Sequence, residues 1–151
     1  MKVALDTNIL AYAEGINGIE KRDVVLELVR NLPQEAAIIP VQVLGELFNV
    51  LTRKAGRSRA EAREALLDWR DTFPVVETAP EVMLAAADLA TDHHFSIWDA
   101  VILSVSSQAG CRLLLSEDLQ DGFTWGGVTV VNPFASTRHA LLESLLGGSG
   151  A

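Results

Sequence analysis

The sequence has a single cysteine, Cys111, among its 151 residues. One cysteine cannot form an intramolecular disulfide, and it cannot supply the several thiolates of a structural zinc cluster. No internal repeat and no sustained heptad pattern is visible, which excludes fibrous and coiled-coil architectures. The low cysteine content favours a reducing compartment.

Long apolar runs are also missing. The densest apolar clusters, such as residues 100–105, are interrupted by polar residues well short of the roughly 18–20 residues that cross a bilayer. The N-terminus carries Lys2 and Asp6 where a signal peptide would have its apolar core. We therefore expect a cytoplasmic protein that does not associate with membranes.

Positive charge is scarce, since 12 Lys and Arg residues stand against 20 Asp and Glu residues and the formal net charge is −8. This balance argues against a protein that coats nucleic acids nonspecifically, but not against an enzyme that acts on them through bound cations. The exception is residues 53–70, with six basic and three acidic residues. Two interpretations of this segment stay open: a patch that contacts phosphates, or a solvent-exposed helix with Glu–Arg pairs at helical spacing.

The composition is that of a folded globular protein. Hydrophobic residues make up 49% and charged residues 21% of the chain. The length corresponds to one domain, which we expect to span residues 1–146. Residues 147–151, Gly-Gly-Ser-Gly-Ala, have the composition of a flexible tail.

Short apolar segments alternate with amphipathic ones along the chain. Apolar character predicts strands at residues 2–6, 36–39, 74–77, 111–115 and 128–131. Helical spacing and capping residues predict helices at 23–32, 41–53, 59–71, 81–93, 97–109 and 135–146. The alternation predicts an α/β fold, a three-layer sandwich whose mostly parallel central sheet is flanked by helices.

Residues that follow strands are the first candidates for a site, because ligands of such folds bind beyond the carboxyl ends of the strands. Asp6, Thr7 and Asn8 follow the first strand, and residues 116–118 follow the fourth. Asp6 is also suited to cap the helix that begins after it. Asp118 also suits an ordinary turn.

Glu46 belongs to a polar stripe on the predicted helix 41–53, together with Gln42, Asn49 and Arg53. The stripe either faces solvent or lines a cleft. In the second case Glu46 is a metal ligand, Asn49 contacts the substrate, and Arg53 lies near a phosphate.

Asp99 lies in a predicted helix that is apolar nearly all round, a pattern typical of a buried helix. A buried carboxylate is costly unless it is paired, capped or bound to a metal. The motif Ser96-x-x-Asp99 permits a capping box, so capping and metal binding both stay open. We expect Trp98 to pack in the core rather than to stack on a base.

Four carboxylates that converge on one sheet edge would repel one another, and burial raises the cost of their charge. A fold that keeps them together needs a cation. Oxygen ligands without a convergent Cys/His set favour Mg²⁺, with Mn²⁺ as a plausible substitute. Such ions activate water near neutral pH and stabilise charge on a phosphoryl oxygen, which favours hydrolysis of a phosphodiester.

The order of these residues resembles a known family, the PIN-domain ribonucleases, and looks most like the VapC-type toxins of type II toxin–antitoxin systems. The resemblance extends from Met1 to about Pro133. It is carried by four segments in this order: Asp6-Thr7-Asn8, Glu46 with Asn49, Trp98-Asp99-Ala100, and Ser116-Glu117-Asp118-Leu119-Gln120.

The resemblance implies a Mg²⁺-dependent endoribonuclease that leaves 5′-phosphate and 3′-hydroxyl ends. It implies a cytoplasmic toxin that forms a homodimer and is neutralised by a small antitoxin protein. The implied catalytic metal ligands are Asp6, Glu46, Asp99 and Asp118, with Thr7, Asn8 and Ser116 binding near the metal or the scissile phosphate. For the fourth acid, Glu117 and Asp121 are alternatives; strand alternation favours Asp118 because it lies on the same side as Ser116.

Other functions fit parts of the same pattern. A haloacid-dehalogenase-type phosphatase would use Asp6 as its nucleophile, but it needs a second Asp two residues later, where this chain has Asn8. A PIN-like module that binds nucleic acid without turnover would keep the fold and lose the chemistry. A dinucleotide-binding domain is excluded because no glycine-rich turn follows the first strand.

Overall fold

The structure of the chain, a computed structural model, describes residues 1–147. Within them, six strands form one sheet in the order β3-β2-β1-β4-β6-β5. Neighbouring strands are parallel except for β5 and β6, which are antiparallel. The strands are β1 (Lys2–Leu5), β2 (Ala37–Pro40), β3 (Val75–Val76), β4 (Cys111–Leu115), β5 (Thr124–Trp125) and β6 (Val128–Val131).

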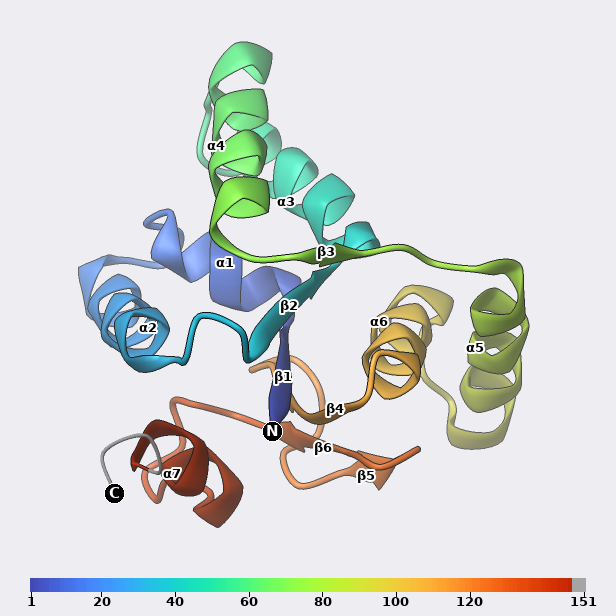
Figure 1. The fold of residues 1–151 in the computed structure, drawn as a ribbon. Coiled ribbons are helices and arrows are strands. Elements are labelled where there is room, and N and C mark those ends of the chain that lie inside the picture. The colour runs from blue at the N-terminus through green and yellow to red at the C-terminus, as the bar shows by residue number, and fades with distance from the viewer. Residues whose placement is uncertain (148–151) are drawn as a thin grey trace.

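Helices cover both faces of this sheet, which confirms the predicted three-layer α/β sandwich (Figure 1). Helices α1 and α2 lie on one side of the strands and α5 and α6 on the other, while α3 and α4 form a hairpin that extends beyond the sheet. The helices are α1 (Thr7–Ala13), α2 (Ile19–Asn31), α3 (Val41–Arg53), α4 (Arg59–Thr72), α5 (Pro80–His93), α6 (Ile97–Gln108) and α7 (Ala140–Gly147).

Two helix starts follow the capping signals in the sequence. Pro40 is the N-cap residue of α3, and α3 has the predicted bounds. At α4 the Ser58 hydroxyl accepts from the Glu61 amide, and the Glu61 carboxylate accepts from the Ser58 amide. This reciprocal pair is the predicted capping box.

The C-terminal part of the described chain differs from the prediction. Strand β5 was not predicted, because it has only two residues and joins β6 through a tight turn in which Gly126 and Gly127 adopt φ values of 57° and 80°. Helix α7 begins at Ala140 rather than at 135, since Asn132 holds the preceding segment in a turn by accepting from the Phe134 amide. Of the predicted tail, residues 148–151 lie outside the described residues.

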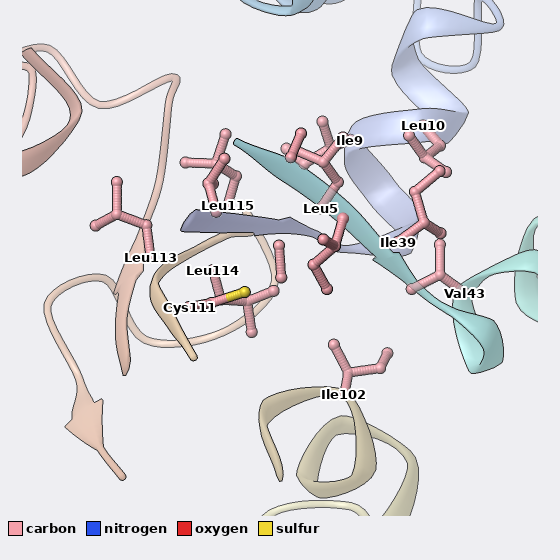
Figure 2. Packing of buried hydrophobic residues seen from close by; sticks show 14 of the residues in the cluster. Leu5, Ile9, Leu10, Ile39, Val43, Ile102, Cys111, Leu113, Leu114 and Leu115 are labelled. Carbon is pink, nitrogen blue, oxygen red and sulfur yellow. The ribbon is translucent and has the colours of Figure 1, made fainter. Parts of the chain in front are cut away.

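The central strands are buried on both faces. Figure 2 shows Ile102 of α6 approaching the strands from one side, while Ile9 and Leu10 of α1 approach from the other. Leu5 of β1 and residues 113–115 of β4 are fully buried between these helices. Each such side chain contributes roughly 1.5–3 kcal/mol on burial, so the ends of β1 and β4 rest on a rigid base.

The strand order reverses at β1, which lies between β2 and β4. Such a reversal opens a crevice at the carboxyl ends of the strands, where loops leave toward opposite faces. The residues after β1 and β4 therefore meet at this edge. Among residues 1–147, none of the helices has the length and apolar character that a membrane-spanning segment requires.

Candidate functional site

Asp6 stands at the centre of this edge, directly after β1, and only 4% of it is exposed. Its carboxylate caps α1 by accepting from the Thr7 amide at 2.7 Å. It also accepts from the Ser116 hydroxyl at 2.7 Å and from the Asn8 side-chain amide at 3.4 Å. These hydrogen bonds tie the end of β1 to the end of β4.

Burial raises the pKa of Asp6 to about 6, although the hydrogen bonds from Ser116 and Thr7 oppose the shift. The negative charges of Asp99 and Glu46 raise it further. Three acids from three separate elements thus influence one another at this edge.

Glu46 lies in the second turn of α3 and is half-buried. Its carboxylate accepts from the Thr7 hydroxyl at 3.1 Å. Burial raises its pKa, the hydrogen bond from Thr7 opposes this, and the charges of Asp99 and Asp118 add to it. The polar stripe of α3 therefore borders the acids at its Glu46 position.

Asp99 lies in the first turn of α6, where its backbone amide donates to the Ser96 hydroxyl at 3.1 Å. Half-burial raises the pKa of the Asp99 carboxyl, the Ser96 side chain opposes the shift, and the charge of Asp118 adds to it. The serine thus caps the helix, while the carboxylate lies within electrostatic reach of the other acids.

Asp118 and the two alternatives for the fourth acid, Glu117 and Asp121, have different surroundings. Asp118 is exposed and lines a cavity together with Thr7 and Glu46. Glu117 accepts from Tyr12 at 2.7 Å and is ion-paired with Lys21; burial opposes its ionisation, but these hydrogen bonds lower its pKa. Asp121 accepts from the Asn132 amide at 2.9 Å and lines neither cavity described below.

Two cavities adjoin the acids and share Glu46 and Asn49. The first, of about 410 Å³, lies between α1, α3 and the loop after β4, and it includes Lys54. The second, of about 600 Å³, lies between the exposed face of α3 and the start of α6. The two cavities therefore adjoin at Glu46 and Asn49.

The four acids carry uncompensated charge within residues 1–147. None of the ion pairs there involves Asp6, Glu46, Asp99 or Asp118. Nor do any three His, Cys, Asp or Glu side chains of these residues form a ready-made metal cluster. Oxygen donors that are near one another but not closed into a cage suit Mg²⁺, which binds through one or two carboxylates and keeps several waters.

The other predicted site residues differ in how accessible they are. Ser116 is fully buried, and its hydroxyl also accepts from the amides of Asp118 and Leu119. Asn8 is 8% exposed and its carbonyl accepts from the Glu117 amide. Both side chains connect the loops around Asp6, and Asn8 also lines the first cavity described above.

Thr7, Asn49 and Arg53 remain at the surface of the site or near it. Thr7 and Asn49 line the first cavity, and Asn49 also lines the second. Arg53 is exposed at the last position of α3 and lines neither cavity, whereas its neighbour Lys54 lines the first.

The basic segment 53–70 is partly structural. Arg57 donates to the Glu14 carboxylate at 2.6 Å and to the Glu14 carbonyl at 2.7 Å. Trp69 donates to the other Glu14 oxygen at 3.0 Å. These bonds fasten α4 to the end of α1, so this arginine is not available to a phosphate.

Two residues near the site were not identified from the sequence. Tyr12 and Lys21 hold Glu117, and nothing in their local patterns marks them, because the contact joins positions about 100 residues apart. The prediction that Trp98 packs in the core is wrong, since 52% of it is exposed. Trp98 lies in the first turn of α6, beyond the sheet edge, and the helix enters the core only at Ala100 and Val101.

Comparisons with known proteins agree with this fold. The sequence model of the family described as "PIN domain" matches residues 3–121. A search of curated proteins finds no match.

Three solved structures have similar folds. VapC20 of Mycobacterium tuberculosis, a sarcin–ricin-loop-cleaving toxin, has a TM-score of 0.65 at 19% identity, covering 75% of this chain and 87% of that chain. A toxin–antitoxin complex from Klebsiella pneumoniae has a TM-score of 0.65 at 19% identity, covering 88% and 98%. FitAcB from Neisseria gonorrhoeae has a TM-score of 0.65 at 17% identity, covering 87% and 98%.

Proposed function

Since this chain belongs to the PIN-domain family, we propose that it is a Mg²⁺-dependent endoribonuclease and the toxin of a toxin–antitoxin pair. Two of the similar solved structures are named as a toxin and as a toxin–antitoxin complex, and the toxin is named as one that cleaves the sarcin–ricin loop. These names support the proposal, and the arrangement of the acids supports its chemistry.

The observation that carries the proposal is the electrostatic influence that Asp6, Glu46, Asp99 and Asp118, from four separate elements, exert on one another. Burial and mutual repulsion raise the pKa of Asp6, Glu46 and Asp99. A fold does not gain stability from such a cluster in the absence of a cation. The cluster is therefore best understood as a binding site for a divalent ion.

The four carboxylates would hold Mg²⁺. When bound, the ion supplies Lewis-acid chemistry, polarising a phosphoryl oxygen and lowering the pKa of water for attack on phosphorus. Asp118 is the fourth ligand in this proposal, because Glu117 is already paired with Lys21 and Tyr12.

The protein's own contribution is to fix these groups in place. The hydrogen bonds of Ser116 and Asn8 hold the Asp6 carboxylate in one orientation. Thr7 does the same for Glu46. Lys54, in the cavity on the Asp118 side, would contact the RNA backbone and offset part of the negative charge of the protein.

The proposal is tested by incubating the purified chain with total RNA and with a single-stranded DNA of matched sequence. We expect cleavage of RNA that requires Mg²⁺, stops with EDTA and returns when the ion is added back. Asp99→Asn should reduce this cleavage by about 10²- to 10³-fold, whereas Asp88→Asn, at an exposed position of α5, should leave it unchanged.

Three outcomes would contradict the proposal. EDTA-sensitive cleavage by Asp99→Asn at the wild-type rate would remove Asp99 from the site. Retention of RNA without cleavage would indicate a binding module. Preferential cleavage of the DNA would make the protein a DNA nuclease with the same chemistry.

The toxin role and the dimer are tested separately. Expression of the chain should arrest bacterial growth, and expression of Asp99→Asn should not. A small protein encoded immediately upstream should restore growth and co-purify with the chain. We expect the isolated chain to have the mass of a homodimer; growth that is unaffected by an active nuclease would contradict the toxin role alone.

A further inference from the structure

The second cavity beside the acids has an unusual lining. It is an open groove of about 600 Å³ bordered by Val41, Gln42, Gly45, Glu46 and Asn49 of α3 and by Trp98 of α6. Two of its apolar members are well exposed, Trp98 at 52% and Val41 at 42%. An exposed indole at the border of a groove offers a flat apolar face to a ligand.

The charge of the groove excludes a phosphate as its occupant. Its lining has no Lys or Arg, and its one charged member, Glu46, is acidic. What remains is an aromatic face, the amides of Gln42 and Asn49, and an apolar wall. This combination matches a nucleobase, which has a flat π-face for stacking and polar edges for amide hydrogen bonds.

Gly45 provides a second, independent observation. It lies in the middle of α3, where glycine is less favourable than alanine because its backbone loses more freedom. Its φ is not positive, and a Cβ at this position would have no atom within 4 Å. Neither the backbone nor packing requires this glycine, and its effect is to leave the floor of the groove without a side chain.

We propose that this groove receives an unpaired base of the RNA next to the scissile phosphate, with Trp98 stacking on it. The inference rests on the proposed ribonuclease function. Glu46 and Asn49 line both cavities, so a strand whose phosphate lies at the acids would have its backbone beside Lys54 in the first cavity and a base in the groove. The groove would therefore favour an unpaired base, because a paired base enters only after the cost of unpairing and unstacking it.

The first test compares cleavage kinetics of four variants on a single-stranded oligonucleotide that contains a mapped cleavage site. Trp98→Ala and Gly45→Leu should raise KM by about 5- to 100-fold with little change in kcat, and Trp98→Phe should retain most of the affinity. Leu84→Ala, which removes a 70% exposed leucine on α5, controls for the loss of an exposed apolar side chain. Melting curves establish that each variant folds.

The second test identifies the base. The oligonucleotide is made abasic at the nucleotide on either side of the cleaved bond. For one of the two, the wild type should lose the same factor in KM as Trp98→Ala, and Trp98→Ala should lose nothing more. If Trp98→Ala and Gly45→Leu keep the wild-type KM, or if their defect persists on both abasic substrates, the proposal is wrong. If the KM defect of Trp98→Ala persists on both abasic substrates and the variant also has a different molecular mass in solution, the groove is instead a contact between copies of the chain.

A binding measurement separates this inference from the ribonuclease proposal. With Ca²⁺ in place of Mg²⁺, a single-stranded oligoadenylate should quench the tryptophan emission of the wild type, and Trp98→Phe should lose that quenching. An RNA duplex should have no such effect. Quenching without cleavage by any form of the chain would support the groove and contradict the nuclease, whereas cleavage without quenching would do the reverse.

Discussion

Two helices of this protein begin with the same pattern, Ser-x-x-acid, and use the acid in different ways. At the start of α4, the Glu61 carboxylate accepts from the Ser58 amide at 2.9 Å, and this bond lowers the pKa of Glu61. At the start of α6, Ser96 accepts from the Asp99 amide at 3.1 Å, but burial raises the pKa of the Asp99 carboxyl.

The surroundings of the two helix starts account for the difference. The start of α4 is at the surface, and Ser58 and Glu61 are exposed there. The start of α6 meets the carboxyl edge of the sheet, where the charge of Asp118 acts on Asp99. A capping motif thus predicts where a helix begins, while the tertiary environment decides what its acid does.

Neutralising the two acids should separate their roles most clearly. Asp99→Asn should reduce Mg²⁺-dependent RNA cleavage by about 10²- to 10³-fold, the scale on which loss of one electrostatic group slows catalysis. Glu61→Gln should leave cleavage unchanged. Initial rates at saturating Mg²⁺ measure both; equal losses in the two variants would mean that Asp99 is only a capping residue.

The pH dependence of the free energy of unfolding should differ in sign between Asp6, at the sheet edge, and Glu61, at the start of α4. Burial raises the pKa of Asp6 from 3.8 to about 6, so in the metal-free protein the folded state holds this proton more tightly than the unfolded state. The stabilisation is complete below the unfolded pKa and is lost as the pH rises through about 6, a change of about 3 kcal/mol.

For Glu61 the pH dependence of the stabilisation has the opposite sign. Its lowered pKa means that its stabilisation is present above the ordinary value of 4.5 and is lost as the pH falls. Urea denaturation of the wild type, Asp6→Asn and Glu61→Gln across this range, without metal, measures both effects. Mg²⁺ should restore wild-type stability above pH 6, because the ion takes the place of the proton. Parallel curves for the wild type and Asp6→Asn would contradict the shift.

Adjacent acids after β4 extend the comparison to a third location. Asp118→Asn should reduce cleavage by about 10- to 100-fold as a metal-site residue, the scale found for groups around a metal. Glu117→Gln should keep cleavage within about two-fold and cost less than about 1 kcal/mol, because its partner Lys21 is partly exposed. A larger loss of activity in Glu117→Gln than in Asp118→Asn would exchange their assignments.

Most of the fold follows from local signals in the sequence. Buried parallel strands are short apolar runs, so β1 and β4 were predicted within one residue, and the ends of those strands indicated where Asp6 and Ser116 would lie. The hydrogen bond between these two residues, 110 positions apart, confirms that they meet. The rule that ligand crevices form at the carboxyl ends of the strands was sufficient to predict that these residues meet.

What could not be predicted depends on contacts between distant segments. The pairing of Lys21 with Glu117 joins α2 to the loop after β4, and no pattern within either segment indicates it. The exposure of Trp98 depends on where α6 crosses the sheet edge, which the apolar character of the helix does not reveal. The same character placed Asp99 in a buried helix, whereas it is half-buried at the rim.

The smallest expected effect comes from removing the serines themselves. Ser58→Ala and Ser96→Ala should each cost about 1 kcal/mol of stability, because each hydroxyl caps a backbone amide at the start of its helix. Only Ser96→Ala should also alter the Mg²⁺ concentration needed for half-maximal cleavage, since the Ser96 side chain lowers the pKa of Asp99 and its loss favours the protonated acid. Thermal melts and Mg²⁺ titrations of both variants measure these effects side by side. If Ser58→Ala shifted the Mg²⁺ dependence as much as Ser96→Ala, the change would reflect general loosening of the protein, and the distinction between a structural and a functional helix start would fail.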